Sequence, residues 1–512
     1  MDESPGGDEV VGRWRVYFHG RDDDPRDLEG DDLVLRFAEV LDRARDRRRR
    51  AGQPFLIDPA GRPDQRLNRW FASDDLRGLE PTTWKKYAYG LVVWLNFLWS
   101  CECSWDDSEA WSDGDVDAEG AFKVWRTQDE DNERLVTPGT YGDNLTVLQL
   151  FYRWAGEEYG VLSPIRLRRG RGRRWDGTPS EKPVTAPKAV RDRDVKWFDP
   201  AGYERYRDVG LLGFTLDGDE DPSWRVRTSQ RNAAFTDGLY RTGLRLEEWA
   251  SVLVSELPLD DGRGFYTCRL AAKCAKGKRG RRYWMPRQAL LTALSYTEGE
   301  RANAVRRAQE AGRYDNMPGA RVLQRVLPGG YLRLQSADGT CSDVPLDALS
   351  PASRRSLLRE TSQGREPLAL WLNEDGMPRA AHGWQHTFTD ANARLAKLGL
   401  TGFAGSAHMM RHSFALRWYS VGRLLYDKQV AHLSADETRD FRHELGSTWD
   451  LVQLLLGHMD QRTTKEVYLE PFQALELELL LMHADNSEIP DLMAAVFGPD
   501  RRVLGDPLAV AR

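Results

Sequence analysis

Apolar positions between residues 63 and 165 recur with the period of amphipathic helices. In "PTTWKKYAYGLVVWLNFLWS" (81–100) Thr82 or Thr83 is the expected N-cap. One apolar stripe follows in this segment: Trp84, Tyr87, Leu91, Trp94, Leu95 and Leu98. Segment 137–160 carries a second stripe: Leu145, Leu148, Phe151, Tyr152 and Ala155. The two stripes predict helices of a small bundle with tryptophans in its core.

Polar stretches flank this predicted bundle. Residues 1–62 form a charged extension, in which 33–50 predicts a helix ending in "RARDRRRR". That basic end is either a solvated helix face or a DNA contact. Residues 166–190 begin with "RLRRGRGRR", six arginines in nine residues, and predict a basic interdomain linker. The linker is either merely solvated or lies along phosphates.

Residues 191–490 alternate between helical patterns and short strands. "GFYTCRLAAK" (264–273) and "RRYWMP" (281–286) predict two strands with a lysine-rich turn between them. Residues 300–365 predict a helix followed by a small strand-rich insertion, and 491–512 form a tail. The fold class is therefore mainly α with a small antiparallel β-sheet.

Length and composition narrow the class of protein. A chain of 512 residues predicts two or three domains. It has no apolar run long enough to span a membrane and no segment of signal-peptide type at its beginning. Its five cysteines lack zinc spacing. We therefore expect a cytoplasmic, reduced protein of bacterial type without structural metal.

Charge gives a mixed signal about nucleic acid. The net charge of −6 argues mildly against a DNA-binding protein. Only 12 of the 73 basic residues are lysines, yet Lys273, Lys276 and Lys278 fall within six residues. This clustering in the predicted turn indicates a local role for lysine that the mean charge hides.

Three further segments offer residues suited to phosphate chemistry. "YRTGLRLEEWASV" (240–252) places Glu248 on the same helical face as Arg245. "SAHMMRHSFALRW" (406–418) presents His408, Arg411 and His412 near a helix start, and "GHMDQRTTKEVY" (457–468) adds His458 and Tyr468. Each segment alone is a weak signal, since such residues are more often surface pairs or core aromatics.

Taken together, these side chains form a set that fits a phosphodiester. Arginine forks bind the non-bridging oxygens, and histidines add hydrogen bonds as negative charge develops. A tyrosine hydroxyl is the nucleophile that remains, and a lysine can protonate the leaving hydroxyl. With so much positive charge, neither a metal ion nor another cofactor is expected.

The four segments, in this order, resemble the tyrosine recombinase (phage integrase) family of site-specific integrases. "TGLRLEE" (242–248) resembles the first arginine motif, and "GKRGRRYWMP" (277–286) resembles the lysine hairpin, in which the lysine precedes a proline by eight residues. "HMMRHSF" (408–414) and "LLLGHMDQRTTKEVY" (454–468) resemble the last two motifs, with Met410 where leucine is usual. The resemblance spans roughly 63–480.

This resemblance implies a role for each motif residue. Arg245 and Arg411 would hold the scissile phosphate, His408 would act as acid or base beside the tyrosine, and His458 would bind a phosphate oxygen. Lys278, with Lys276 as the alternative, would protonate the 5′-hydroxyl. Tyr468 would form a 3′-phosphotyrosine. Glu248 and His412 would be supporting residues.

The resemblance also implies an architecture and partners. Residues 63–165 would be a helical core-binding domain and 191–490 a mixed α/β catalytic domain, together forming a clamp on double-stranded DNA. The partners would be a homo-tetramer on synapsed sites and a possible DNA-bending or excision factor, with no membrane. Candidate DNA contacts share a basic side chain: Lys85, Lys86, Arg166, Arg168, Arg169, Arg171, Arg173, Arg174 and Lys276.

Other functions use the same residues. A topoisomerase-like or telomere-resolving strand transferase would share the chemistry without integrating a mobile element. A catalytically inactive DNA-binding protein could share the fold. The expectation is a recombinase that integrates or excises a mobile element.

Overall fold

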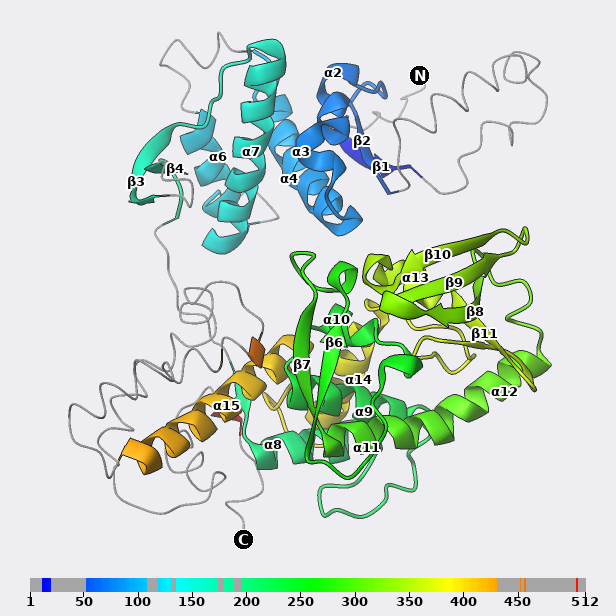
Figure 1. Cartoon of the computed structure of the whole chain (residues 1–512). Helices are drawn as coiled ribbons and strands as arrows, with labels where there is room; N and C mark the ends of the chain where they lie inside the picture. The colour runs from blue at the N-terminus through cyan, green and yellow to red at the C-terminus, as the bar shows by residue number, and fades with distance from the viewer. Residues whose placement is uncertain are drawn as a thin grey trace, which may run out of the picture. The chain divides into compact units, whose positions relative to one another are not determined.

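The computed structural model describes residues 12–19, 52–107, 118–129, 135–173, 179–187 and 196–430, with 452, 455–456 and 503–504. The chain divides into two compact units, Met1–Asp192 and Arg193–Arg512. Figure 1 shows the first unit in blue to cyan and the second in green to orange. Within the described part of the chain, no helix is both long and apolar enough to cross a membrane.

The first unit is built on helices. They are α2 (Gln65–Asn68), α3 (Asp74–Arg77), α4 (Pro81–Ser100), α6 (Ala118–Thr127) and α7 (Pro138–Tyr159). The long helices α4 and α7 meet where Gly90 allows close approach, since a Cβ there would lie 3.1 Å from Val147. The predicted aromatic core is confirmed, because Trp84 and Trp94 are buried in one cluster with Phe151.

The start of α4 differs from the prediction. Its N-cap is Glu80, with Pro81 at the first helical position, and not Thr82 or Thr83. Proline suits this position because its fixed φ is helical and its missing N–H has no partner to lose there. Helix α7 is capped by Thr137, whose side chain accepts from the Thr140 amide, and is followed by Gly160 with a φ of +72°.

The N-terminal region is more than a charged extension. Strands β1 (Arg15–Phe18) and β2 (Pro54–Ile57) pair antiparallel, with Tyr17 opposite Phe55. Leu56 is fully buried in the core cluster of the helices. The expected helix over 33–50 lies outside the described residues.

The predicted basic linker also differs, because it contains a hairpin. Strand β3 (Leu167–Arg173) pairs antiparallel with β4 (Pro179–Pro183). The fully buried carboxylate of Glu119 accepts hydrogen bonds from the amides of Arg166 and Thr185 and from the Thr185 hydroxyl, at 3.0, 3.1 and 2.6 Å. This carboxylate ties both ends of the hairpin to helix α6.

The second unit is also mainly helical. Its helices are α8 (Pro200–Arg205), α9 (Ser229–Thr242), α10 (Leu246–Ala250), α11 (Arg287–Tyr296), α12 (Ala302–Glu310), α13 (Pro351–Arg355), α14 (Gly383–Lys397) and α15 (Ala407–Val430). Helix α9 runs through the core and is almost entirely buried. Gly238 lets α9 approach α10, because a Cβ at this position would lie 2.4 Å from the Trp249 ring.

Two larger strand elements accompany these helices. Strands β6 (Phe265–Leu270) and β7 (Arg281–Pro286) form the predicted antiparallel hairpin, with Phe265 opposite Pro286. A five-stranded sheet follows α12: β8 (Arg321–Leu327), β9 (Tyr331–Ser336), β10 (Cys341–Pro345), β11 (Leu357–Thr361) and β12 (Gly364–Pro367). Short strands β5 (Trp197–Phe198) and β13 (Val503–Leu504) pair in parallel.

The predicted small antiparallel sheet is present in the β6–β7 hairpin, whereas the five-stranded sheet is mixed. The strand order is β10-β9-β8-β11-β12, and β11 runs parallel to β8. The chain leaves β10 through a short 3₁₀ turn, η8 (Leu346–Ala348), and helix α13 before it enters β11. A parallel neighbour requires such a crossover connection, and a tight turn cannot provide it.

Candidate active site

Arg245 and Glu248 lie at the start of helix α10. Glu248 Oε2 accepts the backbone N–H of Arg245 at 2.9 Å, and Oε1 accepts from the Arg245 guanidinium at 3.1 Å. The Glu248 side chain is 2% exposed, whereas that of Arg245 is 27% exposed. The carboxylate therefore orients an arginine whose side chain stays accessible to an anion.

Arg281, which was not among the predicted site residues, completes this cluster. It donates two hydrogen bonds to Glu248, at 2.9 and 2.7 Å, from the first residue of β7. No local pattern marks Arg281 among the neighbouring arginines 279 and 282, since its partner lies 33 residues away. A fork-to-carboxylate pair of this kind is both strong and geometrically specific.

The charge of Glu248 follows from these contacts. Burial alone would raise the pKa of Glu248, but hydrogen bonds and charge from Arg281, then from Arg245, outweigh it and lower the pKa to about 2. The carboxylate is thus ionised at neutral pH and is unsuited to act as a general base there. The ionised carboxylate instead holds the side chains of Arg245 and Arg281 in place.

The lysine hairpin is attached to the same carboxylate. The backbone N–H of Lys276 donates to Glu248 Oε1 at 3.4 Å. Lys278 lies in the exposed turn, with its own N–H donating to the Ala275 carbonyl at 3.0 Å. Its φ of +57° is a left-handed value that few non-glycine residues adopt. The turn thus has a defined backbone at the position where the side chain of Lys278 emerges.

Arg411 connects three distant segments of the chain. It lies on α15, is 1% exposed, and donates to the carbonyl of Gly243, two residues before Arg245. Its second terminal nitrogen donates to the carbonyl of Leu456 at 2.8 Å, two residues before His458 in the sequence. The structure therefore brings the first and third motifs and the start of the fourth together around one guanidinium.

Gly243 makes this meeting possible. Its φ is +66°, and a Cβ there would lie 2.3 Å from the Phe414 ring on α15. Any side chain at residue 243 would be strained and would collide with the helix that carries Arg411. Met410 is fully buried and packs in the core cluster.

The two histidines of the third motif have different environments. His408 is exposed, while His412 is only 3% exposed. Their rings meet edge to face, with centroids 4.4 Å apart. This contact couples the orientation of an accessible imidazole to a buried one.

His458 and Tyr468 lie outside the described residues, as does Gly457. Among the candidate DNA contacts, Arg174 lies outside them too, and Arg171 and Arg173 belong to β3 without described side chains. The described basic candidates Lys85, Lys86, Arg166, Arg168, Arg169 and Lys276 are exposed. Lys86 forms an ion pair with Asp143 at 3.0 Å.

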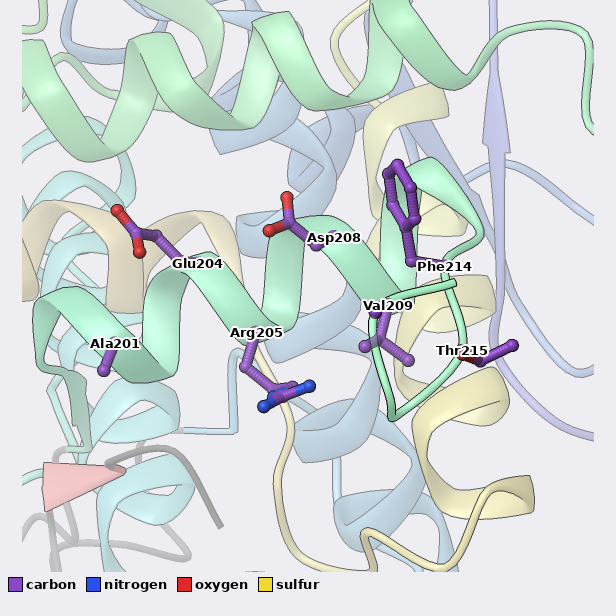
Figure 2. A pocket seen from close by; sticks show the side chains of 8 residues that line it. Ala201, Glu204, Arg205, Asp208, Val209, Phe214 and Thr215 are labelled. Atoms are coloured by element: carbon purple, nitrogen blue, oxygen red, sulfur yellow. The ribbon is translucent and has the colours of Figure 1, made fainter. Parts of the chain in front are cut away.

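A cavity elsewhere in the second unit involves none of the predicted residues. It measures about 300 Å³ and is lined by residues of α8, of the following π turn η3 (Tyr206–Leu212), and of the loop 214–218. Figure 2 shows Glu204 and Asp208 extending from one side of this helix and Arg205 from the other. Among the described residues, no group of three or more His, Cys, Asp or Glu side chains could hold a metal ion.

Neither a family model nor a curated protein matches the chain. Among solved structures, the chain is similar to the XerH site-specific recombinase in a post-cleavage complex with difH substrate, at 12% identity, 82% of this chain, 85% of that chain and a TM-score of 0.42. It is also similar to the Tn1549 transposon integrase in complex with a circular-intermediate DNA. The identity is 14%, the match covers 81% of this chain and 98% of that chain, and the TM-score is 0.37.

XerA recombinase is a third similar structure, at 12% identity, 82% of this chain, all of that chain and a TM-score of 0.29. These proteins are recombinases and an integrase, the class that the sequence motifs predict.

Proposed function

We propose that the protein is a site-specific DNA recombinase of the tyrosine type, which cuts and rejoins strands through a 3′-phosphotyrosine. One observation carries this proposal: the buried Arg411 binds the carbonyls of both Gly243 and Leu456. These contacts join segments separated by 168 and 45 residues, which supports the proposal of one site that holds the arginines together with His458 and Tyr468.

Electrostatics supports a phosphate as the ligand. The buried carboxylate of Glu248 binds the guanidinium groups of Arg245 and Arg281, while the buried Arg411 contacts Gly243 and Lys278 is exposed in the turn that follows Lys276. An excess of fixed positive charge, held before substrate arrives, stabilises the negative charge that develops on a phosphoryl group in the transition state.

In the proposed reaction, the Tyr468 oxygen attacks the scissile phosphorus and the bond from phosphorus to the 5′-oxygen breaks. Arg245 and Arg411 stabilise the non-bridging oxygens, and His458 adds a hydrogen bond. His408 takes the tyrosine proton, and Lys278 gives a proton to the departing 5′-oxygen. The phosphotyrosine keeps the energy of the phosphodiester, so a second 5′-hydroxyl can reverse the step without ATP.

The chain has two compact units, and both of them are proposed to bind double-stranded DNA as a clamp. Recombination then requires two sites and four protomers. Integration or excision of a mobile element is the expected biological outcome of such paired cleavage.

The test is covalent trapping on a nicked duplex that contains the protein's own site. We expect a protein–DNA adduct without added Mg²⁺, and none from Tyr468→Phe, which should still bind the duplex. An adduct formed by Tyr468→Phe would overturn the assignment of Tyr468 as the nucleophile. Relaxation of any supercoiled plasmid without paired sites would instead identify a topoisomerase-like enzyme.

A further inference from the structure

The segment after strand β10 contacts both halves of the candidate site. It comprises η8 (Leu346–Ala348) and α13 (Pro351–Arg355), and we call it the brace (residues 346–355). It connects β10 to β11 within the five-stranded sheet, which Figure 1 shows beside the β6–β7 hairpin. Neither the motifs nor the proposed chemistry uses this segment.

One end of the brace holds the base of the lysine turn. Asp347 forms an ion pair with Arg269 on β6, and its Oδ1 accepts the backbone N–H of Ala272 at 3.3 Å. The thiol of Cys274 donates to the Leu349 carbonyl at 3.6 Å, and both residues are buried. The contacts of Ala272 and Cys274 fall on η5 (Ala272–Cys274), which leads through Ala275 into Lys276 and Lys278.

The other end of the brace holds the region after helix α10. Arg354 is 2% exposed and donates to Glu256 at 2.7 Å and to the Ser251 carbonyl at 3.3 Å. The Ser251 hydroxyl donates in turn to the carbonyl of Glu248 at 2.8 Å. A buried ion pair that also satisfies backbone carbonyls fixes geometry more effectively than an exposed pair.

We propose that the brace positions the lysine turn relative to Arg245 and Glu248, and that Asp347 is a positioning residue for Lys278. This inference rests on the proposed function. The five-stranded sheet thereby acts on the leaving-group side of the reaction, because Asp347 contacts Arg269 and Ala272 at the base of the lysine turn. Displacing a proton donor by a fraction of an ångström slows the step that needs its proton.

Asp343 provides a matched control within the same sheet. Asp347 and Asp343 are 40% and 41% exposed, and each pairs with one arginine, Arg269 or Arg333. Asp343 lies on β10 and its ion pair with Arg333 links β10 only to β9. Asp347→Arg and Asp343→Arg therefore make the same charge change, and only the first touches the lysine turn.

The experiment measures the rate of adduct formation on two nicked duplexes, one with a 5′-oxygen leaving group and one with a 5′-sulfur. Sulfur needs little protonation on leaving. We expect Asp347→Arg to slow cleavage of the oxygen substrate about tenfold and of the sulfur substrate less than about twofold. Asp343→Arg should change neither rate by more than about twofold. Combining Asp347→Arg with Lys278→Ala should add no further defect on the oxygen substrate.

An equal loss on both substrates, or an additive loss with Lys278→Ala, would overturn the proposal. A second measurement separates positioning from global damage: amide hydrogen exchange over residues 271–280 should rise in Asp347→Arg and stay unchanged in Asp343→Arg. If exchange does not rise, the brace does not hold the turn. Failure of the proposed function itself would be seen differently, as the absence of any adduct from the unaltered protein.

Discussion

Arg281 and Glu248 form a two-pronged ion pair, with nitrogen–oxygen distances of 2.9 and 2.7 Å, between the second strand of the lysine hairpin and helix α10. The pair is nearly buried, since the two side chains are 16% and 2% exposed. Glu248 thereby organises Arg281, Arg245 and the backbone of Lys276 at once. The carboxylate is the point at which the first two motifs meet.

Stability should depend on pH through Glu248. Its pKa in the folded protein is about 2, below the ordinary value of 4.5. A lowered pKa contributes stability that is present above pH 4.5 and is lost as the pH falls toward 2, by about 3 kcal/mol in total. We expect the free energy of unfolding of Glu248→Gln to be lower at pH 7 and to change less between pH 5 and pH 3.

Glu247→Gln is the matched control for this pH dependence, because Glu247 is the exposed neighbour on the same helix. Its unfolding curves should follow those of the unaltered protein. Identical pH dependence of Glu248→Gln and the unaltered protein would contradict the ion-pair assignment.

Gly243→Ala should harm both stability and the site. The left-handed φ of +66° costs a non-glycine residue about 1 kcal/mol, and the collision with Phe414 adds about 1–3 kcal/mol. Since the Gly243 carbonyl accepts from Arg411, adduct formation should fall as well. Thermal unfolding and the trapping assay measure the two effects.

The Gly262→Ala variant is the control that separates the cost of backbone strain in Gly243→Ala from the cost of its collision with Phe414. Gly262 has a φ of +86° but nothing within 4 Å of a Cβ. The Gly262→Ala variant should lose only the stability that the backbone strain costs, about 1 kcal/mol, and should cleave DNA at the full rate. Equal losses in the two variants would show that the contact with Phe414 does not constrain residue 243.

Glu119→Ala should loosen the β3–β4 hairpin in the first unit. The substitution removes the acceptor of two backbone amides and one hydroxyl, and each of these partly buried hydrogen bonds contributes about 0.5–1.5 kcal/mol. Hydrogen exchange over residues 166–185 should rise. Asp143→Ala, which removes a 60% exposed partner of Lys86, should leave this exchange unchanged. Unchanged protection in Glu119→Ala would mean that the hairpin is held by other contacts.

Local patterns were sufficient for part of this structure. The stripe of α4 predicted a helix with Trp84 and Trp94 in the core, and the two apolar runs around the lysines predicted the β6–β7 hairpin. Such features depend on residues three or four apart in a helix, or alternating in a strand, and the sequence displays them directly. The motif positions of Arg245 and Arg411 are likewise visible in the sequence, whereas their roles stay predictions.

Other features came only from the tertiary structure. Nothing local marks Arg281 as the partner of Glu248, or Asp347 as the partner of Arg269 across 78 residues. The polar composition of the basic stretch after residue 166 predicted a linker, yet this stretch forms a hairpin that Glu119 anchors. A buried carboxylate selects its donors by where packing places them, and that placement depends on the whole fold. Apolar periodicity therefore predicted the long helices and the β6–β7 hairpin, whereas the pairing of distant charges depends on the packing of the complete fold.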